Sequence, residues 1–400
     1  MSALLVGLND PASIRELAEL AKTAGISSSQ FVLQTRRHPD HNYYVGTGKV
    51  FDIAKLIEEK KFEILIADDE LSPLQHKNLE KQLSIKIMDR TSLILDIFAK
   101  RARTYDAQLQ VELAQLEYLR PRLTHMWTHL SRLGGGIGTR GPGEKQLEVD
   151  RRNIDKRITH IKSKLDKVKQ DRKTSRERRK IVPVLTGAIV GYTNAGKSTL
   201  LNALTNADVF ASRQLFATLD PTTRKIRLPS NETLLLSDTV GFIQKLPHQL
   251  VSAFRATLEE VIEAHFILHV VDVSDPLFHS KIETVQQVLT ELNAQDIPQL
   301  YVFNKIDQSH GKPDIREFQP RVAISALKKM HLGDLLDAID KLLKKNRKKF
   351  RYRIPMNRMD IVNLLHQHGK VLKETYDDSI TIDVEINTVI GQKIMGQLYR

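Results

Sequence analysis

The sequence of 400 residues predicts an α/β protein built from four parts. Apolar runs alternate with helical patterns in residues 1–100 and again in residues 181–345, which favours parallel sheets covered by helices. Residues 101–180 between them carry helical patterns interrupted by one glycine-rich loop, which predicts a long antiparallel helical hairpin. The last segment, 346–400, has a helix pattern at 359–365 and a strand pattern at 379–386, and indicates a small appended α/β module.

The N-terminal part is expected to be a small α/β domain with a parallel sheet. Its expected elements are a strand at 1–7, a helix at 13–21, a helix at 49–61, an apolar strand at 63–68 and a further helix after Pro73. The run Gly46-Thr47-Gly48-Lys49 partly resembles a phosphate loop. It lacks the required spacing, so we interpret it as a turn into a helix.

Two long helices are predicted in the second part, at 104–132 and 147–180. The first carries one leucine stripe at Leu109, Leu113, Leu116 and Leu123. In the second, apolar residues alternate in steps of four and three, which is typical of a coiled-coil seam: Ile154, Ile158, Ile161, Leu165 and Val168. Two such helices joined by a loop predict an antiparallel pair.

The positive charge of the chain is concentrated in the second of these helices. The formal net charge is +13; residues 151–180 hold 14 Lys/Arg and 4 Asp/Glu, or +10, which leaves +3 for the remainder. A solvated helix face is the simple explanation, but an excess of this size favours binding to a phosphate backbone. We therefore expect this helix to contact the phosphate backbone of a nucleic acid.

The loop between the helices is rich in glycine. Six of the 19 glycines fall within residues 134–143. Such a loop is either a slack linker or a segment whose backbone approaches a ligand closely, and Arg140 within it favours insertion into folded RNA. The candidate RNA-contact residues of the hairpin are Gly135, Gly136, Arg140, Arg151 and Arg152.

The third part opens with a strongly diagnostic motif. An apolar strand at 182–190 is followed by the pattern G-x-x-x-x-G-K-S/T and then by an amphipathic helix. Backbone N–H groups, the helix N-terminus and the Lys197 ammonium together form an anion site for phosphates, and the Ser198 hydroxyl is placed to hold Mg²⁺. The expected binding residues are Gly191, Tyr192, Thr193, Asn194, Ala195, Gly196, Lys197 and Ser198.

Three further motifs follow in order and select the nucleotide. A strand at 233–237 ends in Asp238-Thr239-Val240-Gly241, where Asp238 is expected to reach Mg²⁺ through water and the Gly241 amide to bind the γ-phosphate. A strand at 297–303 precedes Asn304-Lys305-Ile306-Asp307, whose carboxylate accepts the N1–H and N2–H₂ donors of guanine and rejects adenine. The backbone of Ser325-Ala326-Leu327 is expected to contact the guanine ring. Together these motifs predict a P-loop GTPase domain that binds GTP and GDP.

Two positions bear on hydrolysis. Phe242 follows Gly241, where many GTPases carry a glutamine that orients the attacking water, so slow intrinsic turnover and stimulation by a partner are expected. Asn194 in the phosphate loop suggests a K⁺ ion beside the phosphates.

The loop 215–224 is expected to supply a threonine that closes over Mg²⁺ and the γ-phosphate. Thr218, Thr222 and Thr223 are candidates, and their spacing does not choose among them.

Composition excludes several other classes. The chain has no cysteine, so neither disulfides nor thiolate metal sites form, and a reducing cytoplasm is the expected location. We also expect a monomer. No run of about 18 apolar residues predicts a membrane span, and the N-terminus lacks the features of a signal peptide. His265 and His269 lie on an expected strand, roughly 13 Å apart, too far to share a metal ion.

The order of these motifs resembles that of the HflX family of bacterial ribosome-splitting GTPases. The family-specific blocks are G-G-G-x-G-x-R-G-P-G-E at 134–144 and F-A-T-L-D-P-T-T-R at 216–224. The resemblance implies that Phe216, Ala217, Thr218, Leu219 and Asp220 contribute to the nucleotide site, and that Thr218 is the switch threonine on Mg²⁺, with Lys197 and Gly241 as catalytic groups. It also implies binding to the large ribosomal subunit and its rRNA, and not to DNA. It further implies stimulated hydrolysis and splitting of stalled or idle ribosomes under stress.

Two alternatives stay open at this point. A GTPase of tRNA modification shares the asparagine in the phosphate loop but is expected to carry a catalytic cysteine or a second cofactor domain, and the chain has no cysteine. A membrane-associated switch protein needs an anchor or an insertion helix, and neither is evident. The basic helix predicts at most weak association with acidic lipids.

Overall fold

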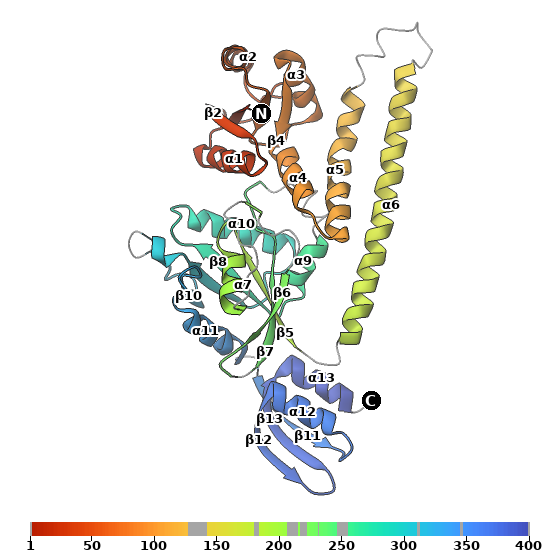
Figure 1. Cartoon of the computed structure of the whole chain (residues 1–400), viewed down its shortest axis with the longest axis vertical. Helices are drawn as coiled ribbons and strands as arrows, with labels where there is room; N and C mark the ends of the chain where they lie inside the picture. Colours follow the sequence, from red (N-terminus) through yellow and green to blue (C-terminus); the bar gives the residue numbers. More distant parts are fainter. Residues whose placement is uncertain are drawn as a thin grey trace. The chain divides into compact units, whose positions relative to one another are not determined.

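The computed structural model supports the α/β architecture (Figure 1). The residues it describes are 2–126, 142–179, 184–205, 215–216, 222–230, 232–245, 255–309, 313–344 and 347–398. The chain divides into two compact units. The first comprises Met1–Gln170, Gln214–Asp220 and Gln244–Ala256, and the second comprises Asp171–Arg213, Pro221–Ile243 and Thr257–Arg400. The four boundaries expected from the sequence stay predictions.

The first unit contains a four-stranded parallel sheet of order β2-β1-β3-β4. Its elements are β1 (Ser2–Leu8), α1 (Pro11–Thr23), β2 (Ser27–Gln34), α2 (Thr47–Lys60), β3 (Ile64–Ala67), α3 (Pro73–Leu83), β4 (Lys86–Asp89) and α4 (Arg90–Arg101). The strands and helices expected at 1–7, 13–21, 49–61 and 63–68 are confirmed. Gly46 is the N-cap of α2, so the partial phosphate-loop pattern there is a turn into a helix, as expected.

Two antiparallel helices follow, α5 (Tyr105–Met126) and α6 (Pro142–Arg179) (Figure 1). Their seam contains the expected apolar residues: Leu109, Leu113, Leu116, Ile154, Ile158, Ile161 and Leu165. Helix α6 begins at Pro142, five residues before the expected start, because proline suits the first helical turn, where its missing N–H is not needed. The glycine loop, with Gly135, Gly136 and Arg140, lies outside the described residues.

The second unit contains a six-stranded sheet of order β10-β9-β8-β5-β7-β6, parallel except for the pair β6–β7. Its elements are β5 (Leu185–Gly191), α7 (Lys197–Thr205), β6 (Thr222–Arg227), β7 (Thr233–Asp238), α9 (Arg255–Ile262), β8 (Phe266–Asp272), α10 (Phe278–Glu291), β9 (Gln299–Asn304), η2 (Ile306–Gln308), β10 (Arg321–Ala323) and α11 (Leu332–Lys344). The carboxyl ends of its parallel strands carry the predicted motifs, as expected for a ligand site in such a sheet.

A small antiparallel sheet of order β11-β13-β12 completes the second unit. Its elements are β11 (Arg347–Ile354), α12 (Met359–His368), β12 (Gly369–Tyr376), β13 (Ile380–Asn387) and α13 (Thr388–Leu398). Buried residues of this module share one apolar cluster with the large sheet, including Tyr352, Ile382 and Leu335. None of the helices that the structure describes is both long and apolar enough to cross a membrane.

One buried ionic network holds the first unit together at the carboxyl ends of its strands. Arg90 is 1% exposed and donates from Nη1 to Asp68 Oδ1 at 2.8 Å, while its other terminal nitrogen pairs with Glu16. Asp68 Oδ2 accepts hydrogen bonds from Ser13 Oγ at 2.6 Å and from Lys245 Nζ at 2.7 Å. The network therefore links α1, the end of β3 and the start of α4.

We predict that Arg90→Ala lowers the local free energy of opening of β1 and β3 by about 3 kcal/mol, because it removes the buried cation that pairs with both Asp68 and Glu16 and leaves Asp68 with the partly exposed Lys245. Native-state hydrogen exchange of the β1 and β3 amides measures this value. Arg15→Ala on the exposed face of α1 is the control and should change it little. Equal protection in the two variants would show that the network contributes no stability.

Candidate nucleotide site

Two glycines fix the shape of the phosphate loop between β5 and α7. Gly191 has φ +155°, and a Cβ there would lie 2.2 Å from the Val270 carbonyl oxygen of the neighbouring strand β8. Gly196 has φ +94°, and its Cβ would lie 2.3 Å from Asn304 Nδ2. Any side chain at either position would push the loop away from the sheet. The two glycines of the motif are thus required by close packing as well as by backbone conformation.

Lys197 begins α7 and turns back over the loop. Its side chain is buried, and Nζ donates to the carbonyl oxygens of Gly191 at 3.1 Å and Tyr192 at 2.9 Å. Burial lowers the pKa of Lys197 to about 8, while the charge of Asp238 acts in the opposite direction. The loop therefore holds one ammonium group in a desolvated position, where the negative charge of a phosphate would stabilise its protonated form.

Ser198 and Asp238 meet at the carboxyl edge of the sheet. Ser198 Oγ donates to Asp238 Oδ2 at 2.6 Å, and Asp238 is 1% exposed. Both side chains offer hard oxygen atoms, which are the ligands that Mg²⁺ prefers. The pair fits the prediction that Ser198 binds the metal and that Asp238 reaches it through water. Thr218, Ala217, Leu219 and Asp220 lie outside the described residues.

The Asp-x-x-Gly segment is attached to the phosphate loop by backbone hydrogen bonds. Thr193 N donates to the Phe242 carbonyl oxygen at 2.7 Å, and Phe242 N donates to the Gly191 carbonyl oxygen at 3.1 Å. A Cβ on Gly241 would lie 2.9 Å from Thr193 Cα and 3.0 Å from Lys197 Nζ, so Gly241 lies directly against the phosphate loop. The Phe242 side chain is 2% exposed and is part of the core.

Asn304 connects the phosphate loop to the loop after β10. Its Nδ2 donates to the Ala195 carbonyl oxygen at 2.9 Å, and its Oδ1 accepts from Ala326 N at 2.9 Å. Lys305 adopts a left-handed conformation, φ 67°, and forms an ion pair with Asp272 at the end of β8. One side chain thus brings together three of the predicted motifs.

Asp307 has an oxygen atom that is buried and ready to accept a hydrogen bond. Within the part of the chain that the structure describes, Asp307 Oδ1 has no hydrogen-bond partner, and the nearest cation, Lys328 Nζ, lies 4.0 Å from Oδ2. A buried carboxylate oxygen without a partner is unfavourable unless a ligand supplies donors. Guanine offers two adjacent N–H donors on one edge, which fits the predicted role of Asp307. Of the residues expected to contact the ring, Ser325 and Ala326 are buried and Leu327 is exposed.

Phe216 is found in the first unit. It is buried, its ring centroid lies 4.5 Å from that of Phe98, and its carbonyl oxygen accepts from Arg101 Nη1 at 2.9 Å. The predicted residues of the phosphate, Asp-x-x-Gly and base motifs all belong to the second unit. Phe216 belongs to the first unit, so it is not part of the same assembled site. Its role in nucleotide binding stays a prediction.

Sequence reasoning missed two residues that shape the site. Asp272 pairs with Lys305, and Lys281 Nζ lies 4.8 Å from the centroid of the Tyr192 ring. The position of Asp272 at the end of an apolar strand could have indicated the first contact, because neighbouring parallel strands end at one edge. Nothing local in the sequence indicates the second. No group of three or more His, Asp or Glu residues suited to a metal occurs among the described residues.

Comparison with known proteins agrees with this geometry. Residues 11–99 match the family "GTP-binding GTPase N-terminal", residues 101–179 match "GTP-binding GTPase Middle Region", and residues 186–305 match "50S ribosome-binding GTPase". The chain is 46% identical to a GTPase HflX of Caldanaerobacter subterraneus subsp. tengcongensis, over 98% of this chain and 91% of the relative. It is 47% identical to GTPase HflX of Escherichia coli strain K12, over 78% of this chain and 72% of that relative.

A solved structure of similar fold is the complex of SsGBP with GDP. It matches with a TM-score of 0.50 and 26% identity, and the alignment covers 86% of this chain and 98% of that chain. A GDP-bound protein of the same fold is consistent with the base and phosphate sites described above.

We predict that GDP affinity falls as pH rises above 8, by up to about tenfold per pH unit. In the free protein the pKa of Lys197 is about 8, and bound phosphates raise it, so binding takes up a proton in this pH range. Calorimetric titration from pH 7 to 9.5 measures the effect. Guanosine, which lacks phosphates, is the control for ionisation of the base itself. The same pH profile for GDP and guanosine would contradict the role of Lys197.

Proposed function

The chain belongs to the HflX family of GTPases, and we propose that it binds the large ribosomal subunit in its GTP form and splits stalled or idle ribosomes, notably under stress. The proposal further holds that the ribosome stimulates GTP hydrolysis, which then releases the factor, and that the protein acts in the cytoplasm as a monomer. The proposal is supported by the combination of two features. The chain carries the motifs of a guanine-nucleotide site, joined by Asn304, and most of its excess positive charge lies in one long helix.

The nucleotide site supports the role of a switch. Mg²⁺, when bound by Ser198 and, through water, by Asp238, would neutralise charge on the β- and γ-phosphates. Lys197 would contact the same phosphates, and the Gly241 amide would donate to the γ-phosphate. Thr218 is the proposed threonine that closes the switch loop over the metal.

The burial of Phe242 supports hydrolysis that depends on a partner. Its side chain is apolar and 2% exposed, so it offers no polar group that could orient a water molecule. Because a water-positioning group usually accounts for a large share of GTPase catalysis, the group has to come from elsewhere in the chain or from the ribosome. We therefore propose slow turnover by the free protein and stimulation by the large subunit.

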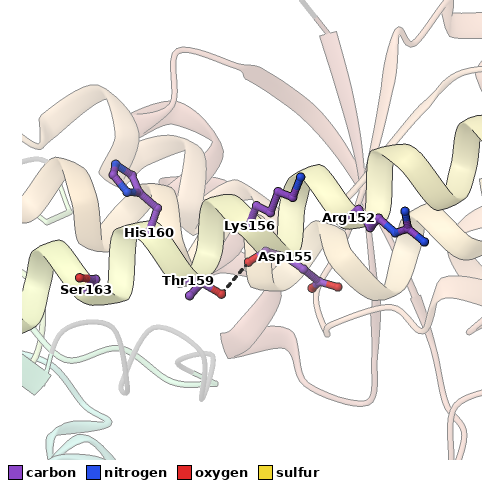
Figure 2. Close-up of a pocket in the computed structure, with 6 residues that line it drawn as sticks. All are labelled: Arg152, Asp155, Lys156, Thr159, His160 and Ser163. Atoms are coloured by element: carbon purple, nitrogen blue, oxygen red, sulfur yellow. Dashed lines mark hydrogen bonds between the residues drawn. The ribbon is translucent and has the colours of Figure 1, made fainter.

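The exposed face of α6 supports contact with rRNA. Figure 2 shows Arg152, Lys156 and His160 on this face, with Thr159, Ser163 and Asp155 lining the same shallow pocket. Helical spacing places Arg152, Lys156, Thr159, His160 and Ser163 away from the Ile158–Ile161 seam that faces α5. Asp155 lies at the edge of the seam and pairs with Arg120 of α5. Arg157 and Lys162 pair with Glu112 and Glu117 of α5, whereas Arg151, Lys156 and Lys167 have no carboxylate within 4 Å among the described residues. These side chains are available to phosphates.

We predict that the GTP-bound protein cosediments with large ribosomal subunits and that the affinity falls steeply with salt, because phosphate contacts release counterions. The measurement is a salt series with GTP, GDP and a non-hydrolysable analogue. Deletion of residues 134–143 should abolish splitting while leaving the GTP affinity of the free protein unchanged. Binding that does not depend on the nucleotide, or splitting that survives the deletion, would contradict the proposal.

We also predict that K⁺ accelerates hydrolysis relative to Na⁺, because Asn194 can help hold a monovalent cation beside the phosphates. Asn194 is exposed and has φ 60°, a conformation that asparagine tolerates, so its side chain lies at the surface of the phosphate loop. Single-turnover rates in the two salts, for the wild type and Asn194→Ala, measure the effect. Equal rates in K⁺ and Na⁺ for the wild type would exclude this role.

A further inference from the structure

The small sheet at the C-terminus has one open face. Side chains of adjacent residues in a strand point to opposite sides, so the register of β11-β13-β12 assigns each residue to one face. The register of β12 shifts between Val371 and Lys373, and this irregularity places Lys373, opposite Asp383, on the same face as Lys370. The inner face is apolar and buried: Tyr352, Ile354, Ile380, Ile382, Val384 and Ile386 have 0% exposure. The other face carries the alternate residues of the same strands, and most of them are exposed or partly exposed.

Basic residues occupy both outer strands of the open face. Strand β11 contributes Lys349, Arg351 and Arg353, and strand β12 contributes Lys370 and Lys373. The central strand β13 contributes the acidic residues of the face, Asp383 and Glu385, beside Thr381. In the register, Glu385 lies between Lys349 and Lys370, and Asp383 lies between Arg351 and Lys373. Five cations against two carboxylates leave an excess of +3 on this face.

Internal pairing satisfies only part of this charge. Arg351 donates from Nε and Nη2 to Asp383 at 2.6 and 2.8 Å, and Arg353 Nε donates to Ser379 Oγ at 2.9 Å. Lys349, Lys370 and Lys373 have no carboxylate within 4 Å in the part of the chain that the structure describes. Three lysine ammonium groups on the flanking strands are therefore available to an anionic ligand.

The spacing of these cations fits a chain of phosphates. Positions two apart on a strand are about 7 Å apart, and the two outer strands lie roughly 10 Å apart. The outer-face positions named above include no aromatic residue on which a base could stack, so contact with the phosphate backbone is favoured over sequence-specific readout. Lysines on edge strands also discourage pairing between sheets, but that role predicts no effect on RNA binding.

We propose that the open face of β11-β13-β12 is a second RNA-binding surface, which contacts backbone phosphates through Lys349, Lys370 and Lys373. This inference rests on the proposed function in one respect, namely that the RNA is that of the large ribosomal subunit. The surface belongs to the same compact unit as the nucleotide site, and the hairpin supplies the other basic region of the chain.

The test compares two triple variants of the full-length protein with equal loss of charge. Lys349→Gln/Lys370→Gln/Lys373→Gln removes the proposed contacts, and Lys55→Gln/Lys60→Gln/Lys81→Gln removes three exposed lysines of the first unit. Binding is measured over a salt series with intact large subunits and with protein-free RNA extracted from them. All six lysines are exposed, so the variants should keep the thermal stability and the free GTPase rate of the wild type.

The C-terminal variant should bind both ligands at least about tenfold more weakly near 0.1 M salt, with a salt slope smaller by about 2–3, while the control variant resembles the wild type. If the wild type binds subunits and the two variants bind equally well, the inference is wrong and the proposed function stands. If the wild type binds neither subunits nor their RNA, both are wrong.

Cross-linking distinguishes RNA from a protein partner on this face. The chain has no cysteine, so Lys370→Cys introduces a single thiol for a photoreactive label, and Lys55→Cys is the matched control. Cross-links from position 370 to rRNA, and few from position 55, support the proposal. Cross-links from position 370 to ribosomal protein alone would overturn it.

Discussion

The two hydrogen bonds of the Asn304 side chain are the constraint on which the nucleotide site depends. One joins Asn304 to Ala195 in the phosphate loop and the other joins it to Ala326 in the loop after β10. Because Gly196 must leave room for the same amide, the phosphate loop and the base loop cannot move independently. The expected phosphate and guanine sites are therefore held in one arrangement at the carboxyl edge of the sheet.

The segments that flank the nucleotide motifs have contacts in both compact units of the chain. Gly241 is held against the phosphate loop through the backbone of Phe242, which exchanges hydrogen bonds with Gly191 and Thr193. Within the first unit, Lys245 of that segment pairs with the buried Asp68, and Phe216 packs on Phe98. Residues that follow the nucleotide motifs in sequence are thus anchored in a different compact unit.

The sequence predicted those features that depend on local spacing. The phosphate loop, the Asp-x-x-Gly turn, the base motif and the α5–α6 seam all follow from short patterns, and the family relationship followed from their order. Contacts that depend on strand order could not be predicted: Arg90 with Asp68 and Glu16, Asp272 with Lys305, and Lys281 with Tyr192. The open face of the C-terminal sheet was missed for the same reason, since alternation in 347–354 is readable but its pairing with 369–376 and 380–387 is not.

The central claim is that guanine recognised by Asp307 controls binding to the large ribosomal subunit. Asp307→Asn tests it directly, because an asparagine amide donates to the C2 oxygen of xanthine, whereas the aspartate accepts from the C2 amino group of guanine. Cosedimentation of this variant with large subunits is measured with GTP and with XTP. The account predicts binding that requires XTP and that GTP no longer supports. Binding of the variant that is equal with GTP, XTP and no nucleotide would contradict it.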